Sequence, residues 1–339
     1  MNRNLTVLTL SQIFSFTAAP VTVFLSGIIG SQISPLKSLS TLPMSISVLG
    51  IAIGAVIASK LMSIIGRKLG FIVGSIGNSL VSIIAAYSIF IQSFYLFCLA
   101  NFFIGVGMAF THQYRFAAAE SVEKNKIPRA ISIILLGGIV SAIIGPAVAN
   151  ISKDLLETYM YVGSYLALSV LTFLPTIFFI FYTNTSKIEI NTVYAGRSYL
   201  ELLSQPKYLQ AIIASAFGYA IMTFLMTGTP LSMHVMEGMS LSKTSIVIQI
   251  HVACMFLPSL ITGNLVKKFG HSKMMYAGSI LYCITVLISF FDQSFFNYMF
   301  ALIFLGFGWN FLFISGTSLL VLTYKENEKY RAQGLNDFI

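Results

Sequence analysis

Long apolar stretches with few charges recur along the chain, each close to the ~20 residues that a helix needs to cross a bilayer. Ten such stretches lie at 5–29, 40–64, 69–91, 94–118, 129–151, 157–183, 208–233, 243–266, 272–291 and 294–322. Only 9% of the 339 residues are charged and 56% are hydrophobic, which is not the composition of a soluble globular protein. The sequence therefore predicts an all-α polytopic membrane protein with these stretches as its transmembrane helices.

The basic residues are distributed by membrane side rather than gathered on one surface. The formal net charge is +9, which would suit a nucleic-acid partner if the charge were clustered. With a cytoplasmic N-terminus, however, 17 of the 20 Lys and Arg residues fall in inner segments, and only Lys37, Lys153 and Lys243 fall outside. This pattern predicts a multi-pass protein of the inner (plasma) membrane, with its N-terminus cytoplasmic and no nucleic-acid partner.

Two parts of the chain repeat each other at an offset of 201–204 residues. Gly66 precedes two basic residues after the second stretch, and Gly270 precedes another basic segment 204 residues later. The Gly-x-Gly motif at 105–107 returns at 306–308. A tandem repeat in one orientation is a transporter arrangement. It predicts an N-terminal six-helix half at 1–183, a cytoplasmic linker loop at 184–207 and a C-terminal half at 208–339.

The second half is shorter than the first. Two apolar stretches follow Arg129 in the first half, whereas the chain stops eight residues after the equivalent Arg331. The repeat therefore predicts that ten of twelve transmembrane helices are present and that the sequence is truncated at its C-terminus. The alternative is a complete protein with ten transmembrane helices.

The segment ending in Gly66-Arg67-Lys68 resembles the signature loop between the second and third helices of the major facilitator superfamily, and the segment around Gly270 resembles its weaker echo. Ser63 stands where that family has an Asp that helps to lock one conformation. The resemblance implies a two-half helical bundle that transports a solute, with the first, fourth, seventh and tenth spans lining a cavity.

Charge and the resemblance together predict that Arg67 or Lys68 pairs with Glu120 at the inner end of the fourth span. The fifth span resembles the antiporter pattern of the family at 141–146, with Ser141 in place of its first Gly. A stripe of small residues on this span predicts either a hinge or contact between the halves, or ordinary close helix packing. The residues predicted to govern conformational change are Gly66, Arg67, Lys68, Glu120, Gly137, Ser141, Gly145, Pro146 and Gly270.

One face of the fourth span is polar. Asn101, Gly105, Met108, His112 and Arg115 fall within roughly an 80° wedge at about 100° per residue. Such a face usually points into a bundle interior or a water-filled cavity. The alternatives are interhelical hydrogen bonds for Asn101 and simple anchoring at the inner interface for Arg115. With the polar faces of other spans, the predicted substrate and cavity residues are Gln12, Asn101, Met108, His112, Arg115, Tyr219, Thr223, Gln249, His251, Trp309 and Asn310.

Three of these residues have a specific predicted chemistry. No acidic residue lies in the middle of a predicted span, so His112 and His251 are the titratable groups left for proton coupling. The alternative is that each histidine is a hydrogen-bonded structural residue. Trp309, the only tryptophan, could stack on a planar ligand or simply pack against its neighbours.

The leading functional prediction is a secondary active transporter that moves a small organic solute by alternating access, with proton-coupled antiport and efflux. Two alternatives stay open: an uptake permease or facilitator for an aromatic or heterocyclic metabolite such as a vitamin, and a transporter-like sensor that does not transport. No nucleotide-binding loop, metal spacing or clustered catalytic residues occur, so we expect no enzyme, no metal and no cofactor. The expected partners are the solute, protons and membrane lipids, for a monomeric protein.

Overall fold

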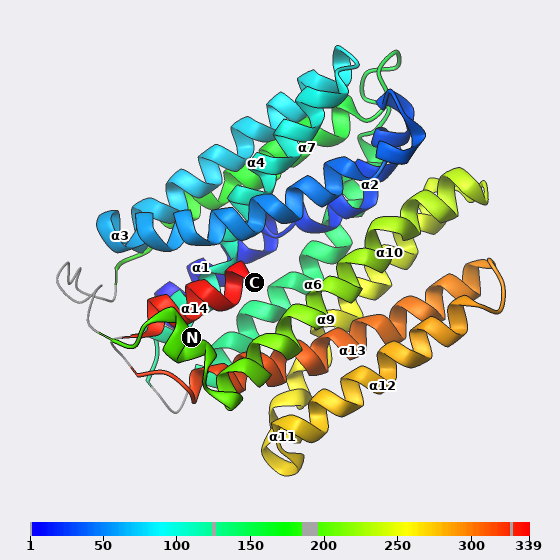
Figure 1. The fold of residues 1–339 in the computed structure, drawn as a ribbon. Helices are drawn as coiled ribbons and strands as arrows, with labels where there is room; N and C mark the ends of the chain where they lie inside the picture. The colour runs from blue at the N-terminus through cyan, green and yellow to red at the C-terminus, as the bar shows by residue number, and fades with distance from the viewer. Residues whose placement is uncertain (1, 124–126, 185–195, 326–327) are drawn as a thin grey trace. The chain divides into compact units, whose positions relative to one another are not determined.

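The computed structural model describes residues 2–123, 127–184, 196–325 and 328–339 (Figure 1). Regular secondary structure in these ranges is helical. Nine of the described helical segments are long and apolar enough to cross a membrane. The predicted class, an all-α polytopic membrane protein, is confirmed.

The helices follow the predicted spans closely and add short elements between them. In chain order they are α1 Arg3–Ser15, α2 Ala18–Ile33, η1 Lys37–Leu39, α3 Leu42–Phe90, α4 Phe94–His112, α5 Tyr114–Glu120, α6 Ile127–Ile151, α7 Val162–Phe179, α8 Tyr199–Leu203, α9 Pro206–Pro230, η4 Leu231–Met236, α10 Leu241–Phe256, α11 Ser259–Phe269, α12 His271–Ser289, α13 Phe295–Val321 and α14 Lys329–Phe338.

Gly66 divides the long helix α3 into the second and third predicted spans. Its backbone has φ 81° and ψ 163°, a conformation that residues with a Cβ rarely adopt. Gly270, which separates α11 from α12, has φ 86° and ψ 158°. The two glycines that the sequence repeat aligns therefore make the same sharp change of direction, which explains why each is glycine.

Several predicted spans are interrupted or shorter than expected. The first span is broken at residues 16–17, the fourth at Gln113 and the eighth at residues 257–258. The sixth span begins at Val162 rather than at residue 157, because Tyr161 has φ 71° and turns precede it. Each break leaves backbone groups that need partners from outside the helix.

The chain forms two compact units. The first unit comprises Met1–Lys187 and Met226–Gln249, and the second comprises Ile188–Leu225 and Ile250–Ile339. In the first unit, α3 packs against α4 and α7, and α1 contacts α6 and α7. In the second unit, α12 packs along α13 (Figure 1). The predicted halves divided at 184–207 stay a prediction, and residues 185–195 of that linker lie outside the described part of the chain.

Four buried aromatic rings belong to the hydrophobic core of the first unit. The Phe71 ring lies 4.8 Å from Tyr114, 5.1 Å from Phe179 and 5.8 Å from Tyr182, measured between centroids. The Tyr114 hydroxyl is 2.9 Å from Ser15 Oγ. This core ties the part of α3 beyond Gly66 to α1, α5 and α7.

The sequence repeat is also a repeat of helix packing. A Cβ on Gly105 would lie 2.0 Å from the Ser47 carbonyl oxygen, so α3 and α4 touch through backbone there. In the second unit, a Cβ on Gly306 would lie 2.8 Å from the His251 carbonyl oxygen, so α10 and α13 make the equivalent contact. The pairs are displaced by 204 residues for Ser47 and His251 and by 201 residues for the glycines. The same displacements relate Gly107 beside Asn78 to Gly308 beside Tyr282.

Candidate functional site

Arg67 and Glu120 form a two-fold hydrogen-bonded ion pair in the first unit. Arg67 Nη2 donates to Glu120 Oε1 at 2.6 Å, and Arg67 Nε donates to Oε2 at 2.7 Å. The two side chains are only 10% and 18% exposed. The planar guanidinium fork matches the carboxylate, so the pair fixes direction as well as distance. The predicted pairing of the inner loop with Glu120 is confirmed for Arg67.

Lys68 has different partners from the one predicted. Its Nζ donates to the Ile180 carbonyl oxygen at 2.7 Å, and its backbone N–H donates to Asn184 Oδ1 at 3.0 Å. The cation therefore sits at the C-terminal end of α7, where the helix dipole favours positive charge. Asn184 Nδ2 would lie 2.9 Å from a Cβ on Gly66, so the same asparagine also covers the break in α3.

The small residues of α6 pack against the broken first span. A Cβ on Gly137 would lie 3.2 Å from the Thr9 carbonyl oxygen, and one on Gly145 would lie 3.2 Å from the Thr17 carbonyl oxygen. α6 continues as a helix through Pro146. These contacts belong to the first unit alone, and they match the close-packing alternative for this stripe.

Ser141 bonds to backbone exposed by the break between α1 and α2. The last carbonyls of a helix lack partners within it. The Thr17 amide bonds to the Phe14 carbonyl at 3.2 Å, one residue short of the α-helical register. Ser141 Oγ lies 2.7 Å from the Ile13 carbonyl oxygen and is fully buried. The Ser141 hydroxyl thus donates a hydrogen bond to the first span at the point where its helix is interrupted.

The polar stripe of the fourth span has two parts in the structure. Asn101 is fully buried, and its Nδ2 donates to the Phe97 carbonyl oxygen at 2.9 Å within α4. Met108 is 7% exposed, whereas His112 and Arg115 are half-buried, and Arg115 lies over the Phe116 ring at 4.7 Å. Gln113 has φ −73° and ψ −13° and separates α4 from α5, so Arg115 lies on α5 and the other residues of the stripe lie on α4. A packing role suits Asn101, and the pathway role of the others stays a prediction.

Four aromatic rings from α9, α10 and α13 form a cluster in the second unit, called here the aromatic cluster. Trp309 is stacked on Phe313, with centroids 4.5 Å apart and planes 13° from parallel. Tyr219 meets both rings edge-on at 5.6 Å, and Phe256 meets Trp309 edge-on at 5.8 Å. Trp309 is 3% exposed, and its Nε1 has no hydrogen-bond partner among the described residues. Burying a hydrogen-bond donor without a partner costs free energy. The Trp309 N–H could therefore donate to an acceptor on a bound molecule.

The side-chain amide of Asn310 forms hydrogen bonds with three other residues of the protein. Nδ2 donates to the Met255 carbonyl oxygen at 2.7 Å and to Ser259 Oγ at 2.8 Å. Oδ1 accepts from Thr262 Oγ1 at 2.6 Å. Both amide hydrogens are used. Neither amide hydrogen is left for a solute, and the substrate role that the sequence predicted for Asn310 stays a prediction.

The remaining predicted residues are spread over both units. His251 is fully buried and its Nδ1 bonds to the Leu302 carbonyl oxygen at 2.8 Å, as in the structural alternative. Gln249 Nε2 donates to the Ile143 carbonyl oxygen at 3.3 Å. Gln12 is 6% exposed and packs beside Gly137, while Thr223 is half-buried on the same helix as Tyr219. Their substrate roles stay predictions.

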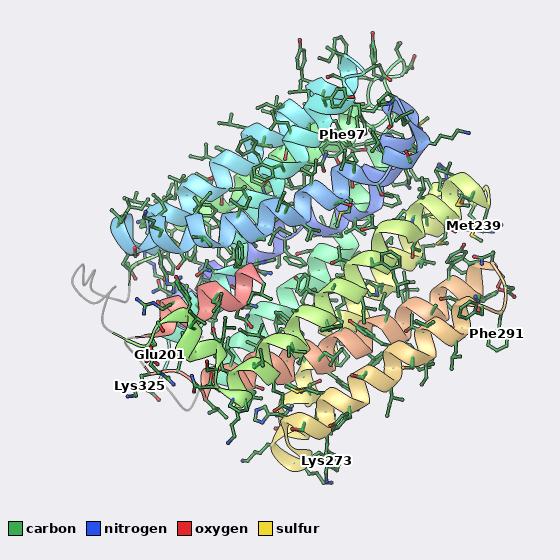
Figure 2. The ribbon with its side chains drawn as sticks, in the orientation of Figure 1. Phe97, Glu201, Met239, Lys273, Phe291 and Lys325 are labelled. Atoms are coloured by element: carbon green, nitrogen blue, oxygen red, sulfur yellow. The ribbon has the colours of Figure 1, made fainter. Side chains whose placement is uncertain are left out.

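A second ion pair, in which the carboxylate is buried and the arginine is partly exposed, had no counterpart in the sequence predictions. Arg197 Nη2 donates to Glu328 Oε2 at 2.6 Å, and Glu328 is 2% exposed. The Arg197 guanidinium holds the pKa of Glu328 well below its usual range, and the amides of Lys325 and Arg197 add to this effect. Glu201 and Lys325, labelled in Figure 2, belong to the two segments that the pair joins. The segment with Glu201 contains the short helix α8, which begins with a Ser198–Glu201 capping box.

A family model described as Major Facilitator Superfamily matches residues 5–339. The riboflavin transporter RfnT of Brucella anthropi is 35% identical over 340 residues, which cover 99% of this chain and 85% of that protein. The uncharacterised MFS-type transporter YdeG of Bacillus subtilis is 27% identical over 99% of this chain and 82% of its own length.

Two solved structures share the fold. The human organic anion transporter MFSD10 (TETRAN) superposes with a TM-score of 0.72 at 12% identity, covering 99% of this chain and 89% of that chain. A bacterial homolog of the human lysosomal transporter Spinster, in an inward-facing and occupied conformation, superposes with a TM-score of 0.68 at 14% identity, covering 98% of this chain and 77% of that chain. At these identities the likeness concerns the fold alone.

Proposed function

The chain belongs to the major facilitator superfamily, and from this premise we propose that it carries a flavin-like vitamin across the membrane by alternating access. That it is a multi-pass membrane transporter and not an enzyme follows from the family and its transporter relatives. The substrate, the direction and the mechanism are the parts proposed here.

The aromatic cluster is the observation that carries the proposal. A tricyclic flavin ring is planar, apolar on its faces and rich in hydrogen-bond acceptors at its edge. Aromatic pairs contribute about 0.5–1.5 kcal/mol beyond the area they bury. The Trp309 indole N–H is a buried donor without a partner among the described residues, as a site for such acceptors requires. The name of the relative from Brucella anthropi, a riboflavin transporter, favours the same solute class.

Uptake is the proposed direction. Many proton-driven transporters carry a buried carboxylate in a membrane helix. The predicted spans contain no acidic residue near their middle, which favours an uptake permease or facilitator. The efflux and antiport prediction rested on the 141–146 pattern, and Ser141 in that pattern bonds to α1. We place the protein in the inner membrane, as a monomer with a cytoplasmic N-terminus.

Growth and uptake of a riboflavin auxotroph test this proposal. Bacteria that cannot make or import riboflavin should grow on low external riboflavin and accumulate the radiolabelled vitamin when they express this chain. Unlabelled riboflavin should compete, whereas pantothenate, which lacks an aromatic ring, should not. If the protein reaches the membrane but labelled riboflavin does not accumulate, the proposed substrate is wrong.

Substitutions at Trp309 link the transport to the aromatic cluster. Trp309→Phe keeps a stacking ring but loses the N–H, and Trp309→Leu loses both. We expect riboflavin uptake to fall in the order Trp, Phe, Leu, with the Michaelis constant rising by about tenfold for the leucine variant. Equal uptake by all three proteins would exclude the cluster from substrate binding.

A further inference from the structure

The eighth predicted span is a broken helix. α10 ends at Phe256 and α11 begins at Ser259, with Pro258 between them. Proline has no backbone N–H and cannot continue the helical ladder. Beyond the break, the Leu260 amide bonds to the Leu257 carbonyl at 3.3 Å, one residue short of the α-helical register. The last carbonyls of α10 therefore need donors from elsewhere.

Asn310 of α13 supplies one such donor. Its Nδ2 bonds to the Met255 carbonyl, which lies in the last turn of α10, and to Ser259 Oγ in the first turn of α11. Thr262 Oγ1 lies 2.6 Å from Asn310 Oδ1 and 2.8 Å from the Pro258 carbonyl oxygen, so it holds the amide in this orientation. One side chain thus contacts both sides of the break. Membrane helices tolerate proline where neighbouring helices bond the freed backbone groups.

The contacts of Asn310 with Met255, Ser259 and Thr262, called here the clamp, lie next to the aromatic cluster on both helices. Phe256 follows Met255 directly, and Trp309 precedes Asn310 directly. Their rings meet edge-on at 5.8 Å. The position of Phe256 depends on how α10 ends, and the position of Trp309 depends on how α13 faces that end. The bond from Asn310 to the Met255 carbonyl ties these two positions together.

We infer that Asn310 is a positioning residue: it holds the break at Pro258 against α13 and so sets the geometry of the aromatic cluster. It acts through Phe256 and Trp309 and not by contact with the solute, because both of its amide hydrogens are donated to protein. The consequence for solute affinity rests on the proposed function. The clamp itself does not, since it concerns contacts among residues of the second unit.

Trp309 reports on the clamp directly because it is the only tryptophan. In the purified full chain, wild-type emission should be blue-shifted and resistant to acrylamide, as expected for a buried indole. Asn310→Ala leaves the Met255 carbonyl without this donor. We expect its emission to shift to longer wavelength and its quenching constant to increase. If Asn310→Ala does not accumulate in membranes, Thr262→Val, which removes only the orienting hydroxyl, should shift the emission in the same direction.

Pro258→Ala provides the rescue. An alanine restores the amide that a continuous helix needs, so the carbonyls of α10 regain partners within their own helix. In the Pro258→Ala background, Asn310→Ala should therefore change Trp309 emission much less than in the wild-type background. Asn297→Ala is the matched control on α13, because Asn297 lies in the first turn of that helix and its side chain donates to the Ile288 and Asp292 carbonyls. It should leave the emission unchanged.

Two results would overturn the inference: unchanged Trp309 emission in Asn310→Ala, or an equal change with and without Pro258. Titration with riboflavin separates this test from that of the proposed function. If the cluster binds the flavin ring, Asn310→Ala should weaken binding by about tenfold through a higher dissociation constant, and Pro258→Ala should recover part of that loss. If wild-type protein does not bind riboflavin while the emission results hold, the substrate proposal fails and the clamp stands.

Discussion

Two arginine–carboxylate pairs join segments that are distant in the sequence. Arg67 and Glu120 are 53 residues apart, and Arg197 and Glu328 are 131 residues apart. In both pairs the guanidinium binds both carboxylate oxygens, an arrangement that lysine cannot reproduce. Each pair therefore constrains the orientation of the two segments it joins. Each also gives a prediction about the stability of the folded protein.

Replacing Arg67 with Lys keeps the charge and removes the fork. We expect Arg67→Lys and Glu120→Gln each to lower the free energy of unfolding by about 1–2 kcal/mol, because a charge-assisted hydrogen bond is lost in a largely buried place. Both variants should also slow uptake if the pair sets the balance between conformations. Thermal unfolding in detergent and initial uptake rates measure the two effects.

Lys60→Ala is the control for the Arg67 pair, since Lys60 is an exposed cation on the same helix. It should change neither quantity. Unfolding and uptake that are the same for Arg67→Lys, Glu120→Gln and wild type would show that the pair has no such role.

The pair in the second unit predicts a pH dependence. The pKa of Glu328 is lowered in the folded protein, chiefly by Arg197, so ionised Glu328 favours the folded state. This stabilisation is fully present above the ordinary glutamate pKa of about 4.3 and is lost as pH falls toward the lower folded pKa. Glu328→Gln should thus be less stable than wild type at pH 7, and the difference should shrink as the pH is lowered below about 4. A difference that is constant down to pH 3 would contradict this assignment.

At the scale of the elements, two broken helices are each completed by a side chain of a neighbour. Ser141 of α6 bonds to the end of α1, and Asn310 of α13 bonds to the end of α10. Neither partner is close in sequence: the bonded residues are 128 and 55 positions apart. Interhelical bonds of this kind replace what water supplies to a broken helix in a soluble protein.

Ser141→Ala tests the first of these contacts. Removal of the hydroxyl leaves the Ile13 carbonyl without this donor inside the membrane helices, and an unsatisfied buried group costs about 1–3 kcal/mol. We expect a lower unfolding temperature for Ser141→Ala. Ser82→Ala is the matched control, because Ser82 is equally buried but bonds only to the Asn78 carbonyl of its own helix. If both variants lose the same stability, the contact with α1 contributes nothing of its own.

The sequence predicts these elements better than it predicts their partners. Length and hydropathy predict the spans, and the need for a residue without a Cβ identifies Gly66 and Gly270. Opposite charges next to a recognised motif predict the Arg67–Glu120 pair. Periodicity gives the face on which Asn310 lies, but not which helix that face meets. Its partners Ser259 and Thr262 could have been suspected, since these small polar residues lie one and four positions after Pro258 in an apolar span. Their bonds to α13 depend on how helices distant in sequence pack.

At the scale of the whole molecule, the two repeated parts of the sequence form the same kind of close contact between helix backbones. Gly105 on α4 and Gly306 on α13 bring their helices against α3 and α10 at equivalent positions. A side chain at either glycine would collide with a carbonyl, so the repeat preserves close approach rather than a chemical group. The polar residues near these contacts differ, with Ser47 in one unit and His251 in the other. The two units therefore have the same backbone contact between helices, but different polar side chains lie beside it.

The charged end of the second unit predicts its orientation in the membrane. In the second unit, Lys273 and Phe291 lie at opposite ends of α12 (Figure 2), and the end with Lys273 also carries Lys267 and Lys268 of α11. Basic residues favour the cytoplasmic side. Fusions of green fluorescent protein at Arg197 or Lys273 should fluoresce, whereas fusions of alkaline phosphatase at Lys153 or Asp292 should be active, because one reporter folds inside and the other outside. Phosphatase activity at Arg197 would reverse the orientation of that segment and contradict an inner linker between two halves that share one orientation.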